Sequence, residues 1–310
     1  MSEQPQQQPI IHPIFEPATS TWQYIVADPS TKSAVVIDSV LDFDPAKNAI
    51  FTSTADALLA LINEKGYTVV KILETHVHAD HLTASRYLQA RLSSSSSGGN
   101  PPELCIGKRI TQVQERFARR YGIEKTEYEG VFDRLLDDDD VFRVGEMEVK
   151  ALHLPGHTPD HIGYLIGYNV FCGDSLFNGD VGSARCDFPG GNAHDLYNSA
   201  QKLLSLPATH RIWTGHDYPP GGESGRTDPV PYTTVADQKR SNKHLKTGTT
   251  EQDFVGWRST RDAGLAEPKL LHQALQFNIR AGRLPAATST GGDRFLHLPL
   301  KIAVSDGLVW

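Results

Sequence analysis

The 310-residue sequence predicts a mixed α/β protein. Two observations support this class. Short runs of apolar and β-branched residues alternate with segments whose apolar residues recur at helical spacing, and metal-competent side chains directly follow several of the predicted strands. Side chains that carry chemistry in α/β enzymes commonly stand at such strand ends. The sequence therefore predicts two βα halves that share one site.

The predicted elements follow this alternation along the chain. Residues 19–28 and 33–39 read as a β-hairpin around Pro29, and residues 53–66 place apolar residues at helical intervals and close with Gly66, a typical helix C-cap. A buried strand over 67–75 completes a ββαβ pattern. Further helices are expected over 82–92, 110–122 and 193–207, and further strands over 103–107, 141–156 (two strands), 162–174 and 210–215.

Composition divides the chain into a main domain and three other segments. Residues 1–19 are rich in Gln and Pro and are expected to form a disordered tail, and residues 93–102 read as a low-complexity surface loop within a main domain spanning 20–232. Residues 233–310 are expected to form a mainly helical C-terminal extension packed on that domain, ending in short strands near 294–300 and 301–304.

Charge and hydropathy exclude several classes of partner. The formal net charge of −7 argues against nucleic-acid binding, and no apolar stretch approaches the roughly 18 residues that a membrane span needs. The N-terminus lacks the basic and apolar regions of a signal peptide, so a cytoplasmic location is the default expectation, with the mitochondrial matrix left open. The three cysteines are widely spaced and are expected to be free thiols.

Seven histidine and aspartate residues form the candidate metal site. The stretch "ETHVHADHLT" follows a predicted strand directly, and in an extended segment His76 and His78 point to the same side. Further donors stand at later strand ends, in loops that contain glycine or proline. Neutral imidazole and carboxylate are the ligands that transition metals share. The sequence therefore predicts a metal centre built from His76, His78, Asp80, His81, His157, Asp174 and His216.

The motifs "THVHADH", "PGHT", "CGD" and "GHDY", in this order, resemble the metallo-β-lactamase superfamily. The resemblance implies an αββα sandwich of two sheets flanked by helices, with metal at one edge, and makes residues 20–232 the catalytic domain. The longer strings "HADHLTASRYL", "GDSLFNGDVGSARCDFPGG", "HDYPPGG" and "RAGRLP" resemble the persulfide dioxygenases, also called sulfur dioxygenases, and in particular a bacterial-type subgroup.

The dioxygenase resemblance implies one Fe(II) held by His76, His157 and Asp174. Two histidines and one carboxylate leave about three positions open on the iron, as non-haem oxygenases require. The implied substrates are glutathione persulfide and O2, and the products are sulfite and glutathione, in the detoxification of sulfide. His78, Asp80, His81 and His216 would then orient the ligands and hold water. The family also leaves a homodimer open.

Two other functions stay open. The same residues fit a dinuclear zinc hydrolase similar to glyoxalase II, with His76, His78 and His157 on one zinc, Asp80, His81 and His216 on the other, and Asp174 on both. Two zinc ions would generate a hydroxide that attacks a thioester. His161, in "GHTPDH", resembles the glyoxalase-like pattern and keeps this alternative open. A non-catalytic metal or thiol sensor is the third class.

Five further residues are candidates for catalysis or substrate binding. By resemblance, Arg185 would stand near the iron, although it could equally pair with Asp187 or Asp180, and Tyr218 could reach the same pocket or simply be a packed aromatic. Glutathione carries two carboxylates. The basic residues expected to bind them lie near the C-terminus and are Lys269, Arg280 and Arg283.

Overall fold

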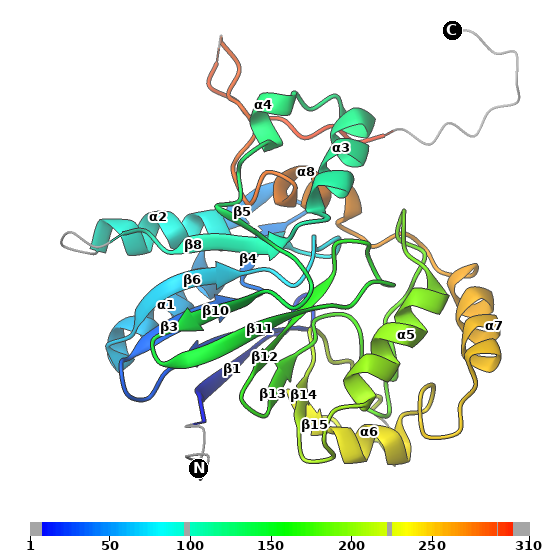
Figure 1. The fold of residues 1–310 in the computed structure, drawn as a ribbon. Helices are drawn as coiled ribbons and strands as arrows, with labels where there is room; N and C mark the ends of the chain where they lie inside the picture. Colours follow the sequence, from blue (N-terminus) through cyan, green and yellow to red (C-terminus); the bar gives the residue numbers. More distant parts are fainter. Residues whose placement is uncertain (1–7, 96–99, 222–224, 290, 300–310) are drawn as a thin grey trace, which may run out of the picture.

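The protein is described from a computed structural model that covers residues 8–95, 100–221, 225–289 and 291–299. Two six-stranded sheets form its centre (Figure 1). The first sheet has the order β1 (Ile10–Glu16), β2 (Thr21–Ala27), β3 (Ser33–Ile37), β6 (Thr68–Leu73), β8 (Glu103–Gly107), β9 (Arg134–Leu136). The second has the order β10 (Val141–Val144), β11 (Met147–His153), β12 (Ile162–Ile166), β13 (Asn169–Phe171), β14 (Arg211–Trp213), β15 (Tyr232–Thr234). A small sheet contains β5 (Ala49–Phe51), β4 (Val40–Asp44) and β7 (Leu82–Thr83).

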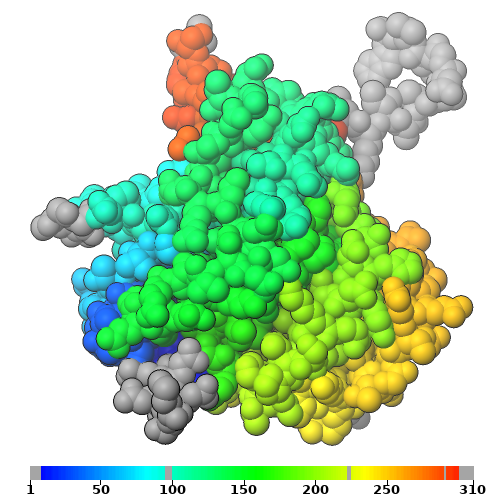
Figure 2. Space-filling model, viewed as in Figure 1, coloured from blue at the N-terminus to red at the C-terminus, as the bar shows by residue number. Residues whose placement is uncertain are grey.

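Helices cover the outer faces of both sheets. The first sheet is covered by α1 (Ser53–Lys65), α2 (Ser85–Ser95), α3 (Ile110–Tyr121) and α8 (Leu271–Asn278), with the short α4 (Lys125–Tyr128) beside α3. The second is covered by α5 (Ala193–Leu204), α6 (Val235–Ser241) and α7 (Glu251–Asp262). The space-filling view shows α7, in orange, along the flank formed by α5 (Figure 2).

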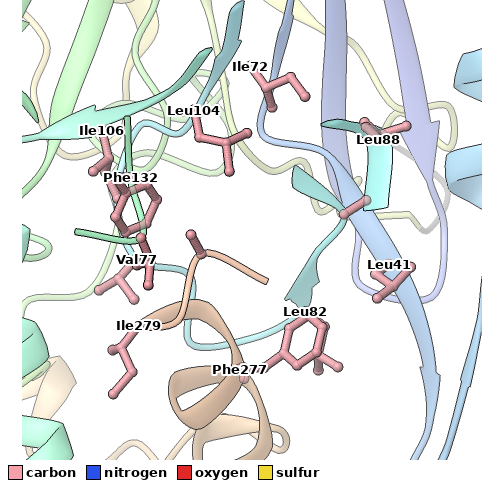
Figure 3. Close-up of a cluster of buried hydrophobic side chains, with 14 of the residues drawn as sticks. Leu41, Ile72, Val77, Leu82, Leu88, Leu104, Ile106, Phe132, Phe277 and Ile279 are labelled. Carbon is pink, nitrogen blue, oxygen red and sulfur yellow. The ribbon is translucent and has the colours of Figure 1, made fainter. Parts of the chain in front are cut away.

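Three apolar clusters match these layers. One lies between the two sheets and includes Tyr24, Phe171 and Trp213. A second packs the first sheet against its helices, with Leu88 of α2 and Phe277 of α8 around strand residues such as Ile72 (Figure 3). The third packs the second sheet against α5, α6 and α7. The layer order is helix, sheet, sheet, helix, and it confirms the predicted αββα sandwich.

Local sequence signals placed most elements correctly. The expected hairpin is β2 and β3, and α1 ends at Gly66, whose φ of 65° is the left-handed conformation that glycine adopts without strain. The strand expected over 162–174 is instead two strands. β12 and β13 pair antiparallel around a turn at Gly167, because that glycine takes a positive φ of 58°.

Parts of the expected domain plan were wrong. Residues 10–16 do not belong to a disordered tail, because β1 pairs with β2 over its full length and its Ile10 and Ile14 pack on the apolar core. α2 continues to Ser95, so the expected loop does not begin at residue 93. Residues 291–299 contain no strand, whereas the strand expected over 301–304 lies outside the described residues. Helices α6, α7 and α8 agree with the helical extension.

The two sheets are joined at the edge that carries the predicted metal residues. The amide of Ile162 at the start of β12 donates to the carbonyl of Thr75 (2.8 Å), and the amide of Trp22 in β2 donates to the carbonyl of Gly215 (2.8 Å). These bonds bring the loops after β6, β11, β13 and β14 together. Within the part of the chain that the structure describes, no helix has both the length and the apolar character to cross a bilayer.

Candidate metal centre

All seven predicted donors lie close together at this joined edge. His76, His157 and Asp174 are buried, and each offers a ligand atom within 4.8 Å of the other two. A second group of the same kind contains His78, Asp80 and His81. The seventh residue joins both groups, because Nε2 of His216 lies 3.2 Å from Asp80 Oδ2 and 3.5 Å from Asp174 Oδ2.

Hydrogen bonds at Nδ1 orient four of the histidines. Nδ1 of His157 lies 2.7 Å from the carbonyl oxygen of Arg185, Nδ1 of His81 lies 3.2 Å from that of Leu82, and Nδ1 of His216 lies 3.1 Å from that of Ser20. A carbonyl only accepts, so each Nδ1 carries the proton and each Nε2 carries a lone pair.

His76 has the same tautomer for a related reason. Its Nδ1 lies 2.9 Å from the hydroxyl of Thr75, and that hydroxyl donates its one proton to Asp38 Oδ2 (2.8 Å). The hydroxyl oxygen must therefore accept from Nδ1 of His76, which leaves Nε2 as the free base. All four rings thus present Nε2 to the centre, as metal-binding histidines held by neighbouring groups do.

His78 is turned the other way. Its Nε2 lies 3.2 Å from Asp38 Oδ1 and 3.1 Å from Glu74 Oε2, so Nε2 carries a proton and Nδ1 faces the other rings. Both carboxylates are buried and are held in turn: Asp38 accepts from the Thr75 amide (2.7 Å), and Glu74 accepts from the hydroxyls of Thr83 and Ser85.

Unsatisfied polar atoms mark the space between these side chains. Within the described residues, five buried ligand atoms have no hydrogen-bond partner: His76 Nε2, His78 Nδ1, Asp80 Oδ2, His81 Nε2 and Asp174 Oδ1. A buried polar atom without a partner costs about 1–3 kcal/mol. A bound cation would remove that cost for several of them at once. The donor set of imidazole and carboxylate fits a transition metal such as iron or zinc.

Burial and mutual contacts set the protonation of these groups. Burial, reinforced by the nearby His78, lowers the pKa of His76 well below 6.5 and that of His81 to about 3, so both are neutral bases near pH 7. Burial acts to raise the pKa of Asp80, but the neighbouring histidines outweigh it and the pKa falls to about 2. For Asp174 burial prevails and the pKa is raised.

A pocket of about 420 Å³ opens onto one side of the centre. Asp80, His157, Asp174 and His216 line its inner end. Gly215 is required beside them, because a Cβ at this position would lie 2.5 Å from Asp174 Oδ1. The walls of the pocket are formed by the loop after Asp174 and by α7 and its neighbouring connections, with Phe177, Tyr218, Lys243, Trp257, Arg261 and Pro268 among the lining residues.

Arg185 and Tyr218 both line this pocket. The guanidinium of Arg185 pairs with Asp187, one of the two partners considered from sequence, and also donates to the carbonyl of Ala266 (2.9 Å). Tyr218 is 48% exposed, and its ring stacks on that of His216 at 5.8 Å between centroids. The structure thus places both residues where a substrate in the pocket would meet them.

The three basic residues expected to bind substrate do not line the pocket. Arg280 is buried, and its guanidinium pairs with Glu127 (2.9 Å) and donates to the carbonyl of Gln276, so it is not placed to meet a substrate in this pocket. Lys269 and Arg283 are exposed outside the lining. Sequence reasoning instead missed Lys243 and Arg261, whose only signal was their position beside the predicted helices of the extension.

His161 is fully buried behind the centre and is absent from the pocket lining. Its Nε2 accepts a hydrogen bond from the backbone amide of Asp174 (2.9 Å). A nitrogen that accepts this bond uses its lone pair for it and cannot also bind a metal, so the ring supports the ligand Asp174 and does not replace it. The residue therefore does not by itself favour the hydrolase over the dioxygenase.

Comparison with known proteins places this geometry in a family. The model of the metallo-beta-lactamase superfamily matches residues 17–216. The chain belongs to this superfamily. It is 40% identical over 294 residues to glyoxylase B2 of Dictyostelium discoideum, covering 94% of this chain and 96% of that protein.

More distant similarities point to a second group of relatives. The chain is 28% identical over 276 residues to the mitochondrial persulfide dioxygenase ETHE1 of Homo sapiens, covering 88% of this chain and 89% of that one. The crystal structure of ETHE1 from Myxococcus xanthus matches with a TM-score of 0.68 and 29% identity, over 88% of this chain and all of that one.

Proposed function

We propose that the protein is a persulfide dioxygenase that oxidises glutathione persulfide at a single Fe(II) held by His76, His157 and Asp174. One persulfide, one O2 and one water give glutathione, sulfite and two protons. The outer sulfur of the persulfide is oxidised by four electrons, and O2 accepts all four. The relatives named persulfide dioxygenase and ETHE1 support this substrate class.

The observation that carries the proposal is the grouping of His76, His157 and Asp174. Their ligand atoms lie within 4.8 Å of one another, and two of the three residues line the pocket. Two histidines and one carboxylate with open space beside them are the donor set of non-haem iron oxygenases. The zinc-pair alternative would instead place His78 with His76 and His157 on one metal. In the structure, His78 groups with Asp80 and His81. At its Nε2 it groups with Asp38 and Glu74.

Bound Fe(II) would supply the redox chemistry that lets O2 react with a sulfur atom. The protein would supply position and charge. The carbonyl of Arg185 and the hydroxyl of Thr75 hold His157 and His76 with Nε2 toward the centre. The aromatic walls of the pocket, including Phe177 and Trp257, would exclude bulk water from the outer sulfur.

Arg185 and Tyr218 would act on the substrate itself. The guanidinium of Arg185 stays charged at any working pH, and the pairing with Asp187 fixes its direction beside the pocket. It would attract the anionic persulfide. Tyr218 stays protonated, because the partial burial of its side chain in the pocket and the nearby Asp80 and Asp174 raise its pKa, so its hydroxyl can donate a hydrogen bond to the sulfur or to an oxygen of the product.

A dinuclear zinc thioester hydrolase is the second candidate. His81 and His216 are buried beside the triad, Asp80 is half-buried there, and the free Nε2 of His81 and Oδ2 of Asp80 could hold a second ion. The 40% identity to a protein named glyoxylase B2 supports it as well. On this reading, two metals would share Asp174 and generate the hydroxide.

Oxygen uptake is the test. Protein reconstituted with Fe(II) is supplied with glutathione persulfide, and O2 consumption and sulfite are followed in the same vessel. The proposal predicts one sulfite per O2. Asp174→Asn is the matched control, since it keeps the shape of the side chain and removes its charge. No uptake by protein that holds iron, together with hydrolysis of S-lactoylglutathione by the zinc-loaded form, would establish the hydrolase instead.

A further inference from the structure

The outer wall of the pocket carries two cations that have no ion pair with any described residue. Lys243 follows α6, and Arg261 lies in the last turn of α7; both are exposed. The other arginines of the pocket are paired: Arg185 with Asp187, and the buried Arg258 with Asp262. Exposed cations are often merely solvated. Lys243 and Arg261 can form a binding site only if the backbone that carries them is held in place.

That backbone is fastened to the loop that carries Asp174. The amide of Lys243 donates to the carbonyl of Gly179 (2.9 Å), and the side chain of the preceding residue, Asn242, donates to the carbonyl of Gly182 (3.0 Å). α7 is fastened to the same loop, because Arg258 donates to the carbonyl of Ala184 (3.2 Å) and Asp262 accepts from the amide of Cys186 (2.8 Å).

These bonds fix the backbone that carries the two cations relative to the loop that carries Asp174. His244 strengthens the arrangement: it packs against Gly182, where a Cβ would lie 2.1 Å from its Nδ1, and it stacks closely on Trp257. A preorganised charge costs little to bring to a ligand. The pocket lining therefore combines metal donors, aromatic side chains and two positive charges that have no ion pair with a described residue.

We propose that Lys243 and Arg261 bind the carboxylates of the thiol substrate while its sulfur lies at the metal end. This inference rests on the proposed function for the class of substrate. Lys243 and Arg261 then take the role in binding glutathione that the sequence analysis expected of Lys269, Arg280 and Arg283. Because the two cations are exposed, the interaction is expected to weaken as salt rises.

Binding without turnover tests this subsite. Zn(II)-loaded protein, which cannot consume O2, is titrated in a calorimeter with reduced glutathione and with glutathione dimethyl ester, whose carboxylates are neutral. We expect the ester to bind at least about tenfold more weakly, and the variant Lys243→Gln/Arg261→Gln to bind glutathione as weakly as the normal protein binds the ester. Lys246→Gln is the matched control, because Lys246 is exposed in the same connection but outside the pocket.

Two results would overturn the subsite: glutathione binding unchanged in the double variant, or glutathione and its ester binding equally weakly to the normal protein. The outcome is separate from that of the oxygen-uptake experiment. Charge-dependent binding of glutathione without O2 consumption would refute the dioxygenase and keep the subsite. O2 consumption by the normal protein, together with unchanged glutathione binding in the double variant, would keep the dioxygenase and refute the subsite.

A second inference concerns His161. Besides accepting from the Asp174 amide, its ring stacks on His76 at 4.9 Å between centroids and an interplanar angle of 23°. One side chain thus contacts two of the three proposed iron ligands on the side away from the pocket. The geometry points to His161 as a positioning residue that sets the direction of both ligands, whichever metal is bound.

Two substitutions separate its roles. His161→Phe keeps a ring against His76 and removes the acceptor, whereas His161→Gln keeps an acceptor near Asp174 and removes the ring. We expect the Phe variant to bind Co(II) about 10 to 100 times more weakly, with an altered visible spectrum, and the Gln variant to keep most of the affinity. Normal affinity and spectrum in the Phe variant would overturn the role, as would a Gln variant that binds Co(II) no better than His161→Ala.

Discussion

The loop after β6 and the loops of the second sheet supply the same centre but face different surroundings. His76, His78 and His81 lie in one short loop and are buried among other protein groups, and only Ala79 and Asp80 of that loop line the pocket. His157, Asp174 and His216 come from three separate loops, and all three line it. The first sheet thus provides a closed base, and the second provides the face that a substrate would meet.

The difference follows from how each loop is supported. The loop after β6 is fixed by buried acids and by Asn278 of α8, which donates to the carbonyls of His78 and His81 (2.8 Å each). The two histidines among the second-sheet donors, His157 and His216, are each held by one backbone carbonyl. We therefore expect the cross-linked loop after β6 to tolerate the loss of one donor better than the three separate loops of the second sheet do.

Removing a donor from the open face should have the largest effect. We expect His157→Ala to abolish iron binding and to lower the rate of oxygen uptake by at least about a thousandfold. Metal analysis of the purified variant and oxygen uptake check this. His194→Ala is the control, because His194 is exposed, pairs with Glu251 and does not line the pocket. If His157→Ala retains one iron per chain, the donors of the open face are not more important for metal binding than those of the closed base.

The metal-free protein should be most stable near pH 6.5. The pKa of His81 is about 3 in the fold and about 6.5 in the unfolded chain, so the unfolded chain binds more protons below pH 6.5 and stability rises with pH there. At pH 5, His81 alone costs about 2 kcal/mol. His216 acts in the opposite sense: burial lowers its pKa, but Asp174 and Asp80 outweigh this and raise it. Its contribution is complete below pH 6.5 and is lost at higher pH.

Urea unfolding at pH 5, 6.5 and 8 measures this profile. The free energy of unfolding should be highest at the middle pH and should fall on both sides. In His81→Phe the loss at pH 5 should shrink. A profile that rises steadily from pH 5 to 8 would show that the raised pKa of His216 does not contribute.

Removing a donor from the closed base should have a smaller effect than His157→Ala. We expect His78→Ala to keep one iron and to lower turnover about tenfold, because His78 would orient the other rings and not hold the metal itself. Iron content and oxygen uptake are measured together, with His78→Gln as the more conservative variant. Complete loss of metal in both variants would make His78 a ligand and would favour the zinc pair.

The smallest expected effect concerns the support of the pocket wall. Thr234 caps α6: its hydroxyl accepts from the amide of Asp237 (3.1 Å), and the Asp237 carboxylate accepts from the amide of Thr234 (3.2 Å). Thr234→Ala should lower the free energy of unfolding by about 1 kcal/mol, as measured in urea. Thr260→Ala, in the exposed last turn of α7, where the Thr260 hydroxyl donates only to the carbonyl of Gly256, should change it by less than about 0.5 kcal/mol.

Local patterns predicted the layers and the donors but not their support. The helix over 53–65 and the clustering of seven donors followed from periodicity and from strand ends. The role of β1 was missed because its pairing with β2 gives the strand an order that its Gln- and Pro-rich surroundings do not suggest. The pairing of Arg280 could not be predicted, because a basic residue in the sequence does not reveal whether an acid such as Glu127 lies beside it.

The pocket wall could not be predicted for a similar reason. Lys243 and Arg261 reach the pocket because side chains and amides bond to backbone carbonyls of the loop after Asp174. Backbone acceptors carry no sequence signal. The tautomer of each histidine is equally hidden, since it depends on carbonyls such as those of Arg185 and Ser20.

The three cysteines determine whether the proposed persulfide substrate would react with the protein itself. Cys105, Cys172 and Cys186 are unpaired and buried, and burial raises the pKa of each to about 12. A thiolate, not a thiol, attacks a sulfur–sulfur bond. At pH 7 only on the order of one molecule in 10⁵ would carry a thiolate at any of these positions. With the proposed persulfide as substrate, the chain would therefore be a poor acceptor of reactive sulfur, and repeated turnover should leave its own thiols unmodified.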